Sequence, residues 1–142
     1  MSMPMEIGLG LWQHHAGTWM MVSSAVGLLL FGLPMLLVPL HWARRMGWGV
    51  ASQDHLAIYF GRTLGMMACV LMTLGIVSAS HPAMQPMMAN AAFAIYLANT
   101  GVHAWGAVRR IQPLSETLEI PFWLALSVLQ LLFYPDVHWR WA

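Results

Sequence analysis

Long apolar stretches joined by short polar connections dominate the chain. The stretches that predict helices are residues 19–40, 56–79, 89–108 and 120–134. A helix needs about 20 mostly apolar residues to cross a bilayer, and the last stretch reaches that length by starting near Ser115. Ser115 and Glu116 are typical of a helix N-terminus, while Pro34 and Pro39 predict a kink or an early stop in the first stretch. The pattern predicts an all-α protein, an integral membrane four-helix bundle that forms one domain over residues 1–142.

The connections between the stretches alternate in charge. Residues 42–54 hold Arg44 and Arg45, residues 109–119 hold Arg109 and Arg110, and residues 80–88 hold no charge. Positive loops face the cytoplasm, so both termini and the connection 80–88 are predicted to lie on the outer, periplasmic side. The tryptophans fit aromatic belts at the two membrane surfaces, with an inner set (Trp42, Trp48, Trp105, Trp123) and an outer set (Trp12, Trp19, Trp139, Trp141).

Composition supports lipid as the solvent for most side chains. Of the 142 residues, 59% are hydrophobic and only 8% are charged, against roughly 25% charged in a soluble domain. The net charge of +1 gives no field that would attract nucleic acid. The first 13 residues lack a basic segment and contain Glu6, so we expect no cleavable signal peptide.

Small residues mark two of the predicted spans. Gly61 and Gly65 form a GxxxG spacing in the second, and a stripe of Ala94, Ala98 and Gly101 runs along the third. Small residues let helix backbones approach each other in lipid. We therefore expect the second and third spans to pack closely together.

Polar residues inside the spans predict a cluster on the cytoplasmic side. Arg62 lies about 9 Å into the second span and His103 about 8 Å from the inner end of the third, so the two share a depth. Asn99 lies one turn from His103. Glu119 and Glu116, at the start of the fourth span, can reach in as counter-charges. The cluster fits a structural hydrogen-bond network, a quinone headgroup site, or a haem or chlorin site with His103 as axial ligand.

A second group of ligands lies on the predicted outer side. The connection after the second span carries a histidine and three methionines, namely His81, Met84, Met87 and Met88. Further candidates near the termini are Met1, Met3, Met5, His14, His15 and His138. Thioether and imidazole ligands suit Cu(I). The alternative is that these methionines only contact lipid or fill gaps.

Catalytic motifs are missing from the sequence. It has no GxSxG, HExxH or CxxC motif and no phosphate-binding loop, and Cys69 is its one cysteine. We therefore expect no enzyme activity.

Two segments and a histidine carry a family resemblance. Residues 27–34 read GLLLFGLP, residues 60–65 read FGRTLG, and His103 comes late in the third span. Over residues 19–134 this layout resembles the DoxX-like group of small four-helix bacterial membrane proteins. The resemblance implies a multi-pass protein of the bacterial inner membrane, and the namesakes are linked to subunits of a quinone-reducing thiosulfate oxidoreductase. The lone Cys69 does not support sulfur chemistry by a cysteine pair.

The sequence leaves three functional hypotheses. The first is a non-catalytic accessory subunit that packs against other integral membrane subunits of a respiratory or photosynthetic complex. The second is an electron-transfer subunit that binds quinone, haem or chlorin through His103 and Arg62, and the third is an outer-face Cu(I)-binding module.

Overall fold

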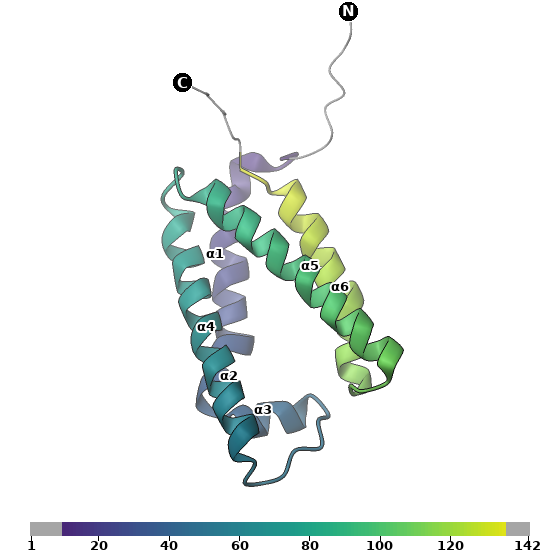
Figure 1. The fold of residues 1–142 in the computed structure, drawn as a ribbon. Coiled ribbons are helices and arrows are strands. Elements are labelled where there is room, and N and C mark those ends of the chain that lie inside the picture. The colour runs from purple at the N-terminus through teal and green to yellow at the C-terminus, as the bar shows by residue number, and fades with distance from the viewer. Residues whose placement is uncertain (1–9, 136–142) are drawn as a thin grey trace, which may run out of the picture.

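The structure is a computed structural model that describes residues 10–135, and every regular element in that range is a helix (Figure 1). The predicted all-α class is confirmed over this range. The elements, in chain order, are the 3₁₀ turn Gln13–His15, α1 Ala16–Gly27, the π-helical turn Leu28–Gly32, α2 Leu33–Leu37, α3 Pro39–Arg45, α4 His55–Ala79, α5 Gln85–Arg109 and α6 Leu114–Leu132.

The first apolar stretch forms a continuous helical run from Gln13 to Leu37 that changes its winding near its end. Pro34 has no N–H to donate to the carbonyl of Leu30, four residues earlier. The indole Nε1 of Trp42 donates to that carbonyl instead, at 3.1 Å. The run ends at Val38, which precedes Pro39 and has a non-helical backbone. The early stop expected from the two prolines is confirmed, and Pro39 begins α3.

Side chains and backbone geometry explain where α4 and α5 begin and end. Asp54 caps α4, because its carboxylate accepts a hydrogen bond from the backbone N–H of Ala57 at 2.9 Å. Pro86 lies in the first turn of α5, where its missing N–H is no loss. Arg110 adopts a left-handed conformation with φ 55° and so ends α5.

The start of α6 differs from the sequence prediction. The helix begins at Leu114, with Pro113 before it, so Ser115 is inside the first turn and is not the N-cap. The Ser115 hydroxyl donates to the carbonyl of Met46, in the connection after α3. The local sequence suggests a cap because serine is common at helix N-termini. It does not reveal that the Ser115 side chain makes a tertiary contact instead.

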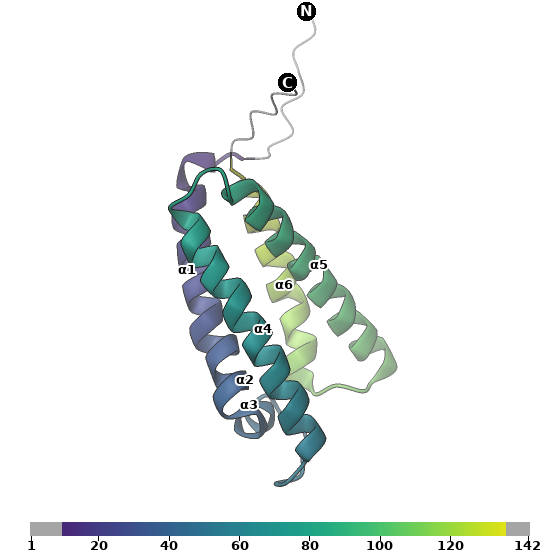
Figure 2. The same ribbon diagram turned by 60° about the vertical axis from the view of Figure 1, so that its left-hand side comes forward.

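The helices pack as two pairs (Figures 1 and 2). The run from α1 to α2 packs along α4, and α5 packs along α6, whereas α4 and α5 share only limited contact. The pairs diverge toward the end of the molecule where α3 lies. The expectation that the second and third spans pack closely was wrong.

The glycines of α4 explain this pairing, because the residues that pack against Gly61 and Gly65 come from the first apolar run and α3, and not from α5. A Cβ atom at Gly65 would lie 2.3 Å from the backbone nitrogen of Leu36, and one at Gly61 would lie 2.6 Å from Cβ of Pro39. On α5, a Cβ at Gly101 would have no neighbour within 4 Å, and Ala94 and Ala98 are also exposed. The small stripe of α5 therefore lies on an exposed face of this helix.

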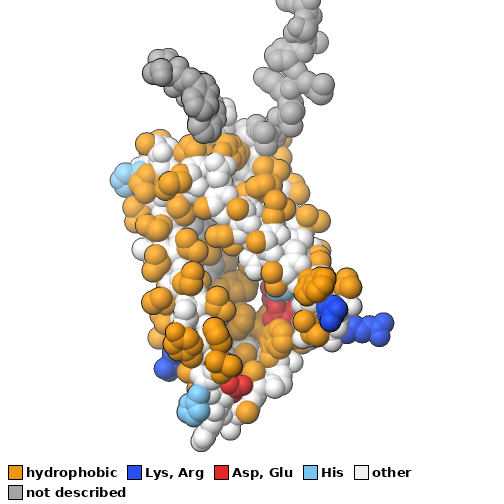
Figure 3. All heavy atoms as spheres, viewed as in Figure 1, with side chains coloured by type: hydrophobic (Ala, Val, Ile, Leu, Met, Phe, Trp, Pro, Cys, Tyr) orange, Lys and Arg blue, Asp and Glu red, His pale blue; other side chains and the backbone are white. Residues whose placement is uncertain are grey.

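Apolar side chains cover much of the surface, and the buried residues include both polar and apolar ones (Figure 3). The buried polar residues between positions 10 and 135 are Ser24, Ser78, Glu116, Ser127 and Gln130. Large apolar side chains such as Val108, 79% exposed, and Leu114, 73% exposed, face outward along the helices. Two helical runs, Gln13–Leu37 and His55–Ala79, are long and apolar enough to cross a membrane.

Candidate functional site

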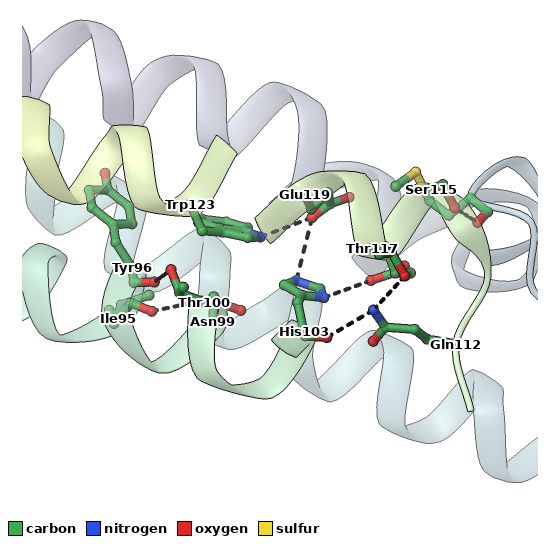
Figure 4. A network of polar contacts seen from close by, with 12 residues as sticks. Ile95, Tyr96, Asn99, Thr100, His103, Gln112, Ser115, Thr117, Glu119 and Trp123 are labelled. Carbon is green, nitrogen blue, oxygen red and sulfur yellow. Dashed lines mark hydrogen bonds and ion pairs between the residues drawn. The ribbon is translucent and has the colours of Figure 1, made fainter. Parts of the chain in front are cut away.

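An imidazole between two carboxylates forms the most concentrated polar cluster in the described part of the chain (Figure 4). His103 comes from the last two turns of α5, and Glu116 and Glu119 come from the first two turns of α6. The spacing of three residues puts both carboxylates on one face of α6. His103 Nδ1 lies 3.3 Å from Glu116 Oε2, and Nε2 lies 3.5 Å from Glu119 Oε2.

Two indoles hold the carboxylates in place. Trp48 Nε1 donates to Glu116 Oε1 at 2.8 Å, and Trp123 Nε1 donates to Glu119 Oε2 at 3.0 Å. The ring of Trp123 also stacks on the imidazole of His103, with 6.2 Å between centroids and 12° between planes. Each carboxylate thus keeps an oriented hydrogen-bond donor on one side and the imidazole on the other.

Gln112 fixes the backbone on which His103 sits. Its Nε2 donates both to the carbonyl of His103 at 3.0 Å and to the hydroxyl of Thr117 at 3.1 Å, so it joins α5 to α6. The side chain packs on Gly106, where a Cβ would lie 2.0 Å from Gln112 Oε1. The connection between α5 and α6 therefore sets the position of the imidazole relative to both carboxylates.

The structure brings together two of the four residues that the sequence assigned to the site, His103 and Glu119. Asn99 is one turn away, but its Nδ2 donates to the carbonyl of Ile95 on its own helix. Arg62 is exposed on α4, and no ion pair or hydrogen bond within residues 10–135 involves it. Its depth matched that of His103, but α4 and α5 diverge at this end, so equal depth did not bring the two together.

The predicted copper ligands after α4 lie in different surroundings. His81 Nδ1 lies 2.7 Å from the carbonyl of Val77, on the last turn of α4. Met87 is 64% exposed, whereas Met88 lines a cavity between the two helix pairs. Met87 therefore faces outward and Met88 faces the cavity. Met84 and Met88 are four residues apart, which is about one helical turn. The further candidates Met1, Met3, Met5 and His138 lie outside the described residues.

The chemistry of the cluster is that of cation binding. When both are ionised, the two carboxylates carry a charge of −2, and a protonated His103 reduces this only to −1. No ion pair in residues 10–135 brings an arginine to either glutamate. An axial bond from His103 to a haem iron or a chlorin magnesium would replace one of its carboxylate contacts. The geometry favours a proton or a bare metal ion over a macrocycle.

Sequence reasoning gave Glu116 only a secondary role and placed Trp48 and Trp123 in an aromatic belt. The spacing of Glu116, Glu119 and Trp123, at three and four residues, was a usable signal, because such residues share a helix face. The contribution of Trp48 had no signal in the sequence, since it depends on how the connection after α3 folds onto α6.

Comparison of the chain with protein-family models, curated proteins and solved structures finds no match. The resemblance to DoxX-like proteins therefore stays a prediction from the sequence.

Proposed function

We propose that the chain is a four-span integral membrane protein that serves as a non-catalytic subunit of a larger membrane complex. The observation that carries the proposal is the extent of the exposed apolar surface, while half of the described buried residues other than glycine and proline are polar or charged. Such a surface is stable when lipid or other membrane helices cover it, because exposed apolar area of this extent is unfavourable in water.

In this proposal the run Gln13–Leu37 and α4, which are long and apolar enough to cross a membrane, are joined by α5 and α6 as the third and fourth spans. By their rise, α5 is about 37 Å long and α6 about 28 Å, close to the 30 Å hydrocarbon thickness. In the view of Figure 3, the Arg side chains gather in the lower part, toward the α3 end. This supports a cytoplasmic α3 end and outer termini in the bacterial inner membrane.

The subunit role follows from how little of the chain lies outside the long helices, where a catalytic or binding domain could form. The connections between the long helices are short, so contact with other proteins has to occur mainly through the helix faces. The exposed stripe of Ala94, Ala98 and Gly101 on α5 is a face of the kind that lets another membrane helix approach. The assignment to a bioenergetic complex, respiratory or photosynthetic, rests on the DoxX-like resemblance.

The test is the native mass of the protein after mild-detergent extraction from its own membrane, with mass spectrometry of the proteins that co-migrate. We expect a mass far above that of a monomer or dimer in its micelle, with defined companions. A small species without companions would contradict the proposal.

A matched pair of variants locates the contact. Ala98→Leu adds bulk to the stripe on α5, and Ala125→Leu makes the same change at an exposed position of α6. We expect Ala98→Leu to reduce the co-migration and Ala125→Leu to leave it unchanged. Equal loss in the two variants would show that the stripe is not a specific contact.

A further inference from the structure

We propose that His103, Glu116 and Glu119 bind one divalent transition-metal ion at the inner end of the α5–α6 pair. One nitrogen or oxygen from each residue can be chosen so that these atoms all lie within 4.8 Å of one another. In a tetrahedral Zn²⁺ site with bonds of about 2.0–2.2 Å, the ligand atoms are about 3.3–3.6 Å apart. Ligand atoms that start up to 4.8 Å apart therefore approach one another when the set closes around an ion, which rotation of the two flexible glutamate side chains can provide.

The donor types select the class of ion. One imidazole nitrogen with two carboxylate oxygens suits Zn²⁺, Fe²⁺ or Mn²⁺, while Mg²⁺ and Ca²⁺ prefer sites made of oxygen alone. Three protein ligands also leave at least one coordination position for water or a small molecule.

Charge gives an independent reason for an ion at this position. Glu116 is only 8% exposed, and the side chains of His103 and Glu119 are 12% and 15% exposed, so the cluster is largely shielded from solvent. The Trp48 and Trp123 indoles and the N-terminus of α6 offset the negative charge only partly. A divalent cation with a neutral imidazole and two carboxylates gives a net charge of zero. Without a metal ion, the cluster reaches zero only when it binds two protons. Burial of uncompensated charge is unfavourable, so the site needs either two protons or one divalent cation, and the ion takes the place of the protons.

The surroundings of the cluster are those of a metal site. Metal-bound histidines usually direct their second ring nitrogen at a carboxylate or carbonyl group, which fixes the orientation of the ring. Each nitrogen of His103 lies near a carboxylate, so the orientation of the ring is already set by the two glutamates that would share the ion with it. Trp123 in turn orients Glu119 by donating to it and by stacking on the imidazole.

The first experiment measures uptake of Zn²⁺ by the full-length protein in detergent after treatment with a chelator, followed by removal of excess metal. We expect one Zn²⁺ per chain in the wild type and its loss in Glu116→Gln, Glu119→Gln and His103→Ala. Glutamine keeps the shape of glutamate and its ability to accept the indole hydrogen bond, so the two Gln variants test charge and ligation without removing the packing. Equal uptake by wild type and Glu119→Gln would overturn the proposal.

Exposed histidines elsewhere need a matched control. His14 and His15 lie side by side, with ring centroids 4.0 Å apart, and both are exposed. The double variant His14→Ala/His15→Ala should still bind one Zn²⁺. Loss of all uptake in this variant would show that the metal binds at the helix start near the N-terminus, and would contradict the proposal.

Co²⁺ provides a readout of the coordination itself. Bound to this set, Co²⁺ should give visible absorption bands of a site with nitrogen and oxygen ligands, and these should be missing in Glu119→Gln. Trp123→Phe keeps the ring but removes the donor to Glu119, so we expect about 10-fold weaker binding, at the low end of the 10- to 100-fold effect of such partners. Unchanged bands in Glu119→Gln would place the ion elsewhere and reject the site.

Discussion

At the scale of single residues, Gly65 carries the closest backbone approach in the molecule's first helix pair. We expect Gly65→Ala to lower the free energy of unfolding by about 1–3 kcal/mol, because its new methyl group meets the backbone of Leu36 and Met35, which cannot rotate away. The measurement is a reversible unfolding titration in mixed detergent micelles, followed by tryptophan fluorescence or circular dichroism.

Gly101→Ala is the control for this prediction, since it is the same change at a helical position with open space around it. In a helix interior alanine is favoured over glycine by about 0.5–1 kcal/mol, so this variant should be as stable as the wild type or slightly more so. Equal destabilisation by both substitutions would show that the effect at Gly65 does not come from its close contact with the first apolar run.

The residue scale is also where prediction from sequence was least complete. His103 and Glu119 could be placed in one cluster, because apolar flanks make polar residues conspicuous. Arg62 could not be placed, because its partner depends on which face of α4 meets another helix. Depth along a span is readable from sequence, but the rotation of one helix relative to another depends on packing at glycines such as Gly61 and Gly65.

At the scale of elements, a hydrogen bond and a stacked ring pair join the two ends of the described chain. Trp19 Nε1 on α1 donates to Gln130 Oε1 on α6 at 3.0 Å, and the Trp19 ring stacks on Phe133 with centroids 5.0 Å apart. Gln130 is only 3% exposed. This contact helps to hold the pair α5–α6 against α1.

A double-mutant cycle measures the contribution of that hydrogen bond. We expect Gln130→Leu to destabilise the protein, with a coupling energy to Trp19→Phe of about 0.6 kcal/mol, the average for hydrogen bonds between membrane helices. Trp19→Phe keeps an aromatic ring for the stack on Phe133, so the cycle isolates the indole N–H. Additive effects of the two substitutions would show that α1 and α6 are held by packing alone.

Element boundaries were predictable wherever a local rule determines them. Pro34 and Pro39 gave the end of the first apolar run, and the apolar stretch 56–79 agrees with α4 to within a residue. The apolar stretch 120–134 misses the first turns of α6, whereas the N-terminal signal that begins at Ser115 lies within a residue of the observed start at Leu114. The first turns of α6 are amphipathic, with Glu116 buried and Leu114 exposed, so a search for uniformly apolar residues begins too late.

At the scale of the whole molecule, the short connections predict that consecutive helices run antiparallel. They do not predict how closely two consecutive helices, such as α4 and α5, pack along their length. The connection between α4 and α5 brings them together at one end only, and the helices then separate. The close contacts are instead formed within the pairs, where Gly61 and Gly65 of α4 accept the first run and Gln112 ties α5 to α6.

The orientation of the whole molecule in the membrane is tested by chemical labelling of single cysteines. In a Cys69→Ala background, Ser52→Cys marks the connection after α3 and Ala83→Cys marks the connection after α4, and both positions are exposed. In intact cells with a permeable outer membrane, an impermeant maleimide should label Ala83→Cys at once, and Ser52→Cys only after the inner membrane is opened. The reason is that Arg44 and Arg45 hold the connection after α3 in the cytoplasm. The reverse pattern would invert the topology, and immediate labelling at both positions would show that α4 does not cross the membrane.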